Sequence, residues 1–81
     1  MDIVASILKE AVGGTRKTRI MYKCNLSFKQ LQVYMDLLIE RGLLKTALEK
    51  EGSNDREVFE TTAKGDAFLH AYRNLNALLS A

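Results

Sequence analysis

The spacing of apolar residues changes twice along this 81-residue chain, and these changes constrain its fold more than any other feature. Up to residue 42 apolar residues recur every three or four positions, which is the spacing of amphipathic helices. Over residues 43–62 they alternate, as in strands, and from residue 63 they return to helical spacing. The pattern predicts a mostly α-helical protein with a small β-hairpin before its last helix.

Two short helices are predicted in the first part of the chain. Residues 2–12 carry one apolar stripe, and the pair Gly13 and Gly14 then stops the helix. Thr15 is the predicted N-cap of a second helix over residues 16–24.

The third helix, residues 27–41, has the clearest start and stop signals of the chain. Ser27 and Gln30 fit a capping box, in which each side chain bonds the backbone N–H of the other residue. Gly42 fits the left-handed position that ends many helices. The apolar stripe expected to face the core consists of Leu31, Tyr34, Met35, Leu38 and Ile39.

A β-hairpin is predicted next. Its strands are residues 43–51 and 56–62, and the stretch EGSND between them has the composition of a turn.

Thr62 is the predicted N-cap of the last helix, residues 63–80. We expect the near half of this helix, around Ala63, Phe68 and Leu69, to pack on the core. The far half should reach beyond a compact domain, and its exposed leucines would then form a homodimer interface. The predicted interface residues are Phe68, Tyr72, Leu75, Leu78 and Leu79.

Three short helices followed by a two-stranded hairpin is the element order of a winged helix-turn-helix domain. The short separation of the second and third helices fits the turn of that motif. On this interpretation residues 1–61 form the winged helix-turn-helix core and residues 62–81 form a C-terminal dimerisation helix. The rival interpretation is a small helical domain with an incidental hairpin.

Basic residues are concentrated around the predicted helix-turn-helix. Residues 9–29 hold six basic residues and one acidic residue, whereas residues 30–81 hold six basic and eight acidic ones. This asymmetry favours a polyanion as partner, and the second helix of such a motif enters the DNA major groove by its N-terminal part. The residues predicted to bind DNA are Arg16, Lys17, Arg19, Lys23, Ser27, Phe28, Lys29, Gln32, Val33, Lys50 and Arg56.

Acidic residues limit this predicted surface. Asp36 and Glu40 repel phosphate, so only the first half of the third helix is expected to meet DNA. Acids also surround the basic residues of the hairpin, whose predicted tip is Ser53 and Asn54.

The stretches TRKTRIMYKCNLSFKQLQVYMDLLIERGLL and VFETTAKGDAFLHAY resemble archaeal winged-helix DNA-binding proteins of the 10a type and related archaeal winged-helix regulators. The shared features are KTRIMY, LSFKQL, LIERGLL and a run formed by Phe59, Thr62, Lys64, Gly65, Phe68 and Leu69. The resemblance implies DNA binding in transcription regulation or chromatin, no catalysis, and a homodimer formed by an antiparallel coiled coil. Only nine residues follow Tyr72, so this coiled coil would be short.

Other classes of function find little support. Cys24 and His70 are the single cysteine and histidine, and neither completes a catalytic triad or a metal site, so no cofactor is expected. Membrane partners and small-molecule substrates are likewise not expected, and a cytoplasmic, nucleoid-associated protein is predicted. The alternative function is a protein–protein interaction module that uses the apolar face of the last helix.

Overall fold

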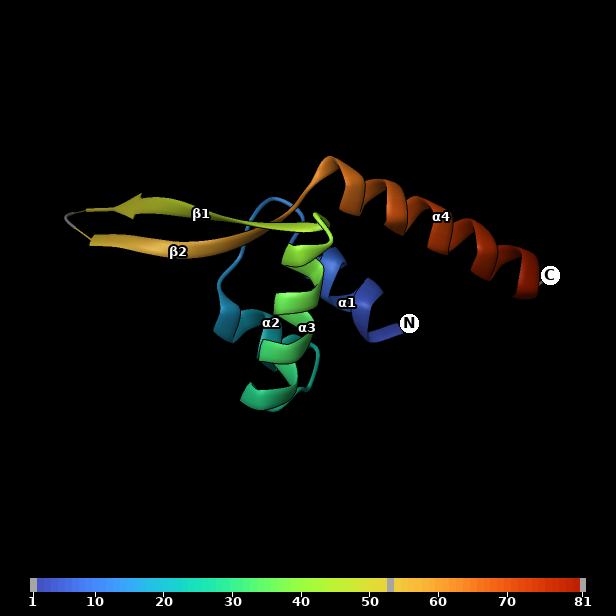
Figure 1. Ribbon diagram of the computed structural model, residues 1–81, viewed down its shortest axis with the longest axis horizontal. Coiled ribbons are helices and arrows are strands. Elements are labelled where there is room, and N and C mark those ends of the chain that lie inside the picture. The colour runs from blue at the N-terminus through green and yellow to red at the C-terminus, as the bar shows by residue number, and fades with distance from the viewer. Residues whose placement is uncertain (1, 53, 81) are drawn as a thin grey trace.

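The computed structural model describes residues 2–52 and 54–80 of the chain. Its elements follow the predicted order, helix, helix, helix, hairpin and helix (Figure 1). The β-hairpin, which forms the wing of the fold, and the last helix project in opposite directions from the helical body. The molecule therefore has extents of 50 × 26 × 20 Å. The elements are α1 (Asp2–Glu10), α2 (Lys17–Lys23), α3 (Phe28–Glu40), β1 (Leu44–Glu51), β2 (Asn54–Thr61) and α4 (Ala63–Ser80).

One apolar core lies where the first three helices meet the base of the hairpin and the start of α4. The stripe predicted for α3 is largely confirmed, because Leu31, Met35 and Leu38 are buried and Tyr34 is half-buried. The prediction for Ile39 was wrong: it is exposed, since it lies at the edge of the stripe in the last helical turn. The largest fully buried side chains are Ile7, Leu8, Ile20, Leu31, Met35, Leu38 and Leu44.

Both ends of α3 are fixed by local hydrogen bonds. The Gln30 N–H donates to the Ser27 hydroxyl at 3.2 Å, and the Ser27 N–H donates to the Gln30 side chain at 3.0 Å, which confirms the capping box. At the other end Gly42 has a φ of 74°, and the Leu43 N–H donates to the Leu38 carbonyl at 2.9 Å. This is a Schellman-type ending, in which a left-handed residue lets the last carbonyls find donors. The helix therefore begins and ends at positions set by its own sequence.

Thr15 does not cap α2, so that prediction was wrong. The N-cap residue is Arg16, whose side chain makes no capping hydrogen bond. Thr15 instead pairs with Phe59 of β2: the Thr15 N–H donates to the Phe59 carbonyl at 2.9 Å, and the Phe59 N–H donates back at 2.7 Å. The segment between α1 and α2 is thereby attached to the base of the wing.

β1 and β2 form an antiparallel pair that runs from Leu44 opposite Thr61 to Glu51 opposite Asn54. β2 begins two residues earlier than predicted, so Asn54 and Asp55 belong to the strand and not to the turn. Opposite charges face each other across this extension, because Lys50 lies opposite Asp55, and such cross-strand pairs stabilise a hairpin.

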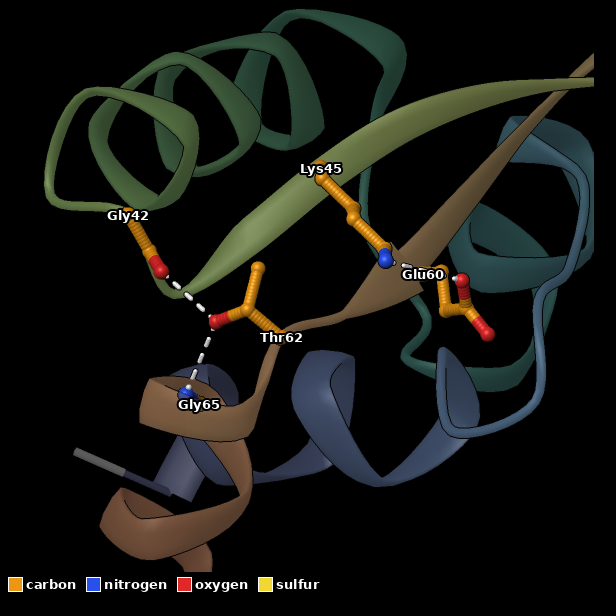
Figure 2. Close-up of polar contacts among 5 residues, drawn as sticks. All are labelled: Gly42, Lys45, Glu60, Thr62 and Gly65. Carbon is orange, nitrogen blue, oxygen red and sulfur yellow. Dashed lines mark hydrogen bonds and ion pairs between the residues drawn. The ribbon is translucent and has the colours of Figure 1, made fainter.

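The base of the wing belongs to the core and its outer part does not. Leu44 is buried, whereas Leu48, on the same face of β1, is exposed. At the base Lys45 and Glu60 form a cross-strand ion pair of 3.5 Å (Figure 2). The predicted tip residue Ser53 lies outside the described residues.

α4 begins at the predicted cap. The Thr62 hydroxyl accepts a hydrogen bond from the Gly65 N–H at 3.0 Å and donates one to the Gly42 carbonyl at 2.6 Å (Figure 2). Gly65 is needed for close packing, because a Cβ atom there would lie 2.2 Å from the Leu43 carbonyl oxygen. The first turn of α4 therefore packs directly against the junction of α3 and β1.

The two halves of α4 differ in burial much as predicted. Leu69 is buried, and Phe68 and Tyr72 are half-buried with their rings stacked at 6.4 Å. Ala63 is exposed, which contradicts its assignment to the core, because the first residue of α4 faces away from the body. The far half projects past the body (Figure 1), and Leu75, Leu78 and Leu79 are exposed.

Candidate nucleic-acid interface

The first half of α3 presents two large apolar side chains to solvent. Phe28 is 63% exposed and Val33 is 64% exposed, and Lys29 between them is also exposed. The capping box satisfies the Gln30 N–H, whereas the N–H groups of Phe28 and Lys29 have no helical carbonyl four residues before them to bond. This part of α3 therefore combines outward side chains with a helix N-terminus that favours negative charge.

Lys17 of α2 reaches the first half of α3. Its ammonium group donates a hydrogen bond to the Gln32 side-chain oxygen and lies 4.7 Å from the centroid of the Phe28 ring. The Gln32 amide nitrogen in turn donates to Asp36 at 2.8 Å. Both ends of the Gln32 amide are thus engaged within the protein, and the Phe28 ring is held beside a positive charge.

Arg16 and Arg19 lie on a different side of α2 from Lys17. They line a surface hollow of about 540 Å³ between α2 and the wing. Because Lys17 and Arg19 are two residues apart, they point roughly 160° apart around the helix. The predicted basic residues therefore form two groups, one beside α3 and one beside the wing. The hollow is lined by Gly14, Thr15, Arg16, Thr18, Arg19, Tyr22, Glu49 and Val58.

Tyr22 is a candidate contact residue that was not predicted from the sequence. It lines the same hollow and is 88% exposed, the largest exposure among the large apolar and aromatic residues described. A sequence signal was available, because Tyr22 lies three residues after Arg19 and two after the buried Ile20. That spacing puts it on the charged side of α2 and away from the core.

The remaining predicted contact residues occupy varied positions. Lys23 is exposed at the end of α2, and the Ser27 hydroxyl is used by the capping box. On the wing, Lys50 is exposed, and Arg56 is half-buried opposite Glu49 and makes contacts within the protein.

A second, apolar surface lies beside α4. A groove of about 440 Å³ separates α4 from α1 and the end of α3, and Phe68 forms part of its wall. A smaller apolar hollow continues along α4 from Phe68 to Leu75. The exposed leucines at the far end of α4 extend this surface. The groove is lined by Val4, Leu37, Leu38, Arg41, Leu43, Lys64 and Phe68.

The described residues offer little reactive chemistry. Burial raises the pKa of the Cys24 thiol, and the negative charge of Glu10 raises this pKa further, so the reactive thiolate is disfavoured. His70 lies 3.6 Å from Asp66 on the exposed face of α4. Over residues 2–52 and 54–80, histidine, cysteine and acidic side chains form no group of three that could hold a metal ion. None of the helices in this part of the chain combines the length and apolar character needed to cross a membrane.

Comparison with known proteins supports the winged-helix fold and the interpretation of this site as a candidate nucleic-acid interface. The crystal structure of Sso10a-2, a DNA-binding protein from Sulfolobus solfataricus, matches with a TM-score of 0.77 and 26% sequence identity, covering 98% of this chain and 79% of that one. An uncharacterized protein of Methanocaldococcus jannaschii is 31% identical over 78 residues, which span 96% of this chain and 70% of the relative.

These similarities confirm the resemblance to archaeal winged-helix proteins of the 10a type. The winged helix-turn-helix family itself matches residues 1–80, which is almost the whole chain. The chain therefore belongs to the winged helix-turn-helix family.

Proposed function

We propose that this protein binds double-stranded DNA by inserting the first half of α3 into the major groove. The observation that carries the proposal is the outward presentation of Phe28, Lys29 and Val33 on a helix whose start is fixed by its capping box. The N-terminal part of this helix is the part that contacts base edges in helix-turn-helix proteins. The family and the similarity to a DNA-binding protein support the same function.

In this proposal the basic residues of α2 and the wing contact phosphates on the two sides of α3. Lys23 and Arg19 are exposed cations on α2, and Lys50 is an exposed cation on the wing. Arg16 adds positive charge beside Arg19, Arg56 adds it on the wing, and Lys17 adds it beside α3. Tyr22, which lines the same hollow as Arg19, can donate a hydrogen bond to a phosphate. Phosphate contacts position a protein on DNA without reading its sequence.

Asp36 and Glu40 restrict the contact to the first half of α3. Both are exposed in its second half, where a phosphate would meet unfavourable negative charge. This half therefore tilts away from the DNA backbone in the proposed complex.

We also propose that the protein is a homodimer whose subunits pair through α4. The exposed Leu75, Leu78 and Leu79 support this, because a row of exposed leucines on a projecting helix is stabilised by burial against a second copy. A symmetric pair would bring two copies of α3 to neighbouring half-sites, and the protein would act as a transcription regulator or a chromatin-associated protein of the nucleoid.

Fluorescence anisotropy of a labelled duplex, titrated at several salt concentrations, tests DNA binding. Binding should be measurable at low salt and should weaken steadily as the salt concentration rises. Each basic side chain that contacts a phosphate releases a cation from the DNA, and this release is less favourable at high salt. Absence of binding at low salt would contradict the proposal.

A second candidate function, protein–protein interaction, is favoured by the apolar groove between α4, α1 and the end of α3. This groove lies apart from the first half of α3. If the wild type fails to bind DNA and remains monomeric, a different protein becomes the better candidate for covering that groove.

A further inference from the structure

We infer that Val33 contacts the 5-methyl group of thymine in the major groove and so gives the protein a preference for A·T pairs. This inference rests on the proposed docking of α3 in DNA and goes beyond it by naming the chemical group that the helix recognises. It follows from the surroundings of Val33 in the first two turns of α3.

Val33 lies outside the core of the folded chain and is 64% exposed. It lies two residues after Leu31 and two before Met35, and both of these are buried. At 3.6 residues per turn, Val33 points about 160° away from each of them. Valine is also a weaker helix former than alanine, lysine or glutamate, because its branched side chain is restricted in a helix. Neither the core nor helix stability therefore accounts for a valine at this position.

The polar side chain best suited to reading a base is already occupied. A glutamine can pair with adenine through both ends of its amide. In this structure the Gln32 oxygen accepts a hydrogen bond from Lys17, and its nitrogen donates one to Asp36. Gln32 would have to break both contacts to read adenine, whereas Val33 beside it is already exposed.

The residues around Val33 favour its contact with a thymine methyl group in the major groove. Lys29 lies one turn before it on the same face and supplies the positive charge that draws the helix toward phosphate. Phe28 adds a second exposed apolar surface, and the Lys17 ammonium group at 4.7 Å holds its ring in place. Among the four bases, thymine alone presents an apolar group in the major groove.

The test compares one short duplex of A·T pairs with the same duplex in which uracil replaces thymine. Uracil keeps every hydrogen-bonding group of thymine and lacks only the methyl. Wild-type protein should bind the uracil duplex about fourfold more weakly for each methyl that Val33 covers. The Val33→Ala variant should bind the two duplexes equally.

Two further comparisons separate direct contact from changes in DNA shape. Val12→Ala, which alters an exposed valine outside α3, should keep the wild-type preference for thymine. In a G·C duplex, 5-methylcytosine places a methyl at the equivalent position, so it should raise the affinity of the wild type and leave that of Val33→Ala unchanged. Circular dichroism checks that each variant keeps its helices.

The outcomes distinguish this inference from the proposed function. If the wild type binds thymine and uracil duplexes equally well, DNA binding stands and the role of Val33 is overturned. If Val33→Ala keeps the full wild-type preference, the preference does not come from Val33 and the inference is again overturned. If the wild type binds none of the duplexes, the proposed function itself fails.

Discussion

The hydroxyl of Thr62 donates a hydrogen bond to the carbonyl oxygen of Gly42 at 2.6 Å and thereby joins the start of α4 to the end of α3 (Figure 2). The same hydroxyl accepts a hydrogen bond from the Gly65 N–H, which caps α4. Lys64 adds a hydrogen bond of 2.8 Å to the carbonyl of Arg41. These contacts fix the direction in which α4 leaves α3, and so they would set the spacing of two copies of α3 in an α4-mediated dimer.

Thr62→Val removes both hydrogen bonds while keeping the shape of the side chain. It should lower the free energy of unfolding by about 1–2 kcal/mol, the usual cost of losing an N-cap. Urea unfolding monitored by circular dichroism measures this. The control Thr62→Ser keeps the hydroxyl and should stay close to the wild type, whereas equal stability of all three proteins would contradict the role of the hydroxyl.

Gly65→Ala should destabilise the protein although alanine is a better helix former than glycine. The added Cβ would lie 2.2 Å from the Leu43 carbonyl oxygen, so α4 would have to shift. Overpacking of this kind costs about 1–3 kcal/mol in unfolding free energy. Asn74→Ala, at an exposed position of the same helix, is the control and should leave stability unchanged or slightly higher. A Gly65→Ala protein as stable as the wild type would show that the packing is looser than described.

The raised pKa of Cys24 makes three measurable predictions. Alkylation of the folded protein should be slower than that of the urea-unfolded protein near pH 8, because less thiolate is present in the folded state. Stability should not depend on this thiol below the unfolded-state pKa, and it should fall as pH rises through the higher folded-state pKa. Glu10→Gln should speed alkylation of the folded protein by removing the smaller cause of the shift. Equal alkylation rates in the folded and unfolded states would contradict the raised pKa.

The proposed pairing of two subunits through α4 predicts a specific effect of added charge. Leu78 is 77% exposed and Leu79 is its exposed neighbour, so Leu78→Glu/Leu79→Glu should fold normally but sediment as a monomer at concentrations where the wild type is a dimer. Glutamate opposes burial because a carboxylate loses its hydration there. The control Asn74→Glu/Asn76→Glu adds the same charge at exposed polar positions of α4 and should remain dimeric. A monomeric wild type, or a glutamate variant that still dimerises, would argue against this interface.

Features set by neighbouring residues could be predicted from the sequence, and features set by distant partners could not. The capping box of Ser27 and Gln30, the stop at Gly42 and the cap at Thr62 depend on residues within one or two turns, and the structure confirms each of them. Thr15 matched a cap locally, but its pairing with Phe59 depends on how the wing folds back.

The sequence predicted which helices and strands form the candidate site better than it predicted the contacts of their side chains. α2, α3 and the wing lie where the pattern placed them. The link from Lys17 to Gln32 joins two helices, and its existence depends on how they pack. Helical spacing already separates Lys17 from Arg19, but it does not reveal that Lys17 reaches Gln32 and Phe28 of α3. Tyr22 was missed because the charged residues dominate the pattern on that face, although its spacing from Arg19 carried the signal.

The most direct test of DNA binding through α2 and α3 is its salt dependence in a variant that removes one cation from each helix. The slope of log affinity against log salt changes by about 0.9 for each phosphate that the protein no longer neutralises. Arg19→Ala/Lys29→Ala should therefore bind more weakly than the wild type, with a slope shallower by about 1 to 2. Lys9→Ala/Arg73→Ala removes the same charges from exposed positions on α1 and α4 and should match the wild type. Identical slopes for all three proteins, or an equally large effect in the control, would contradict DNA binding through α2 and the first half of α3.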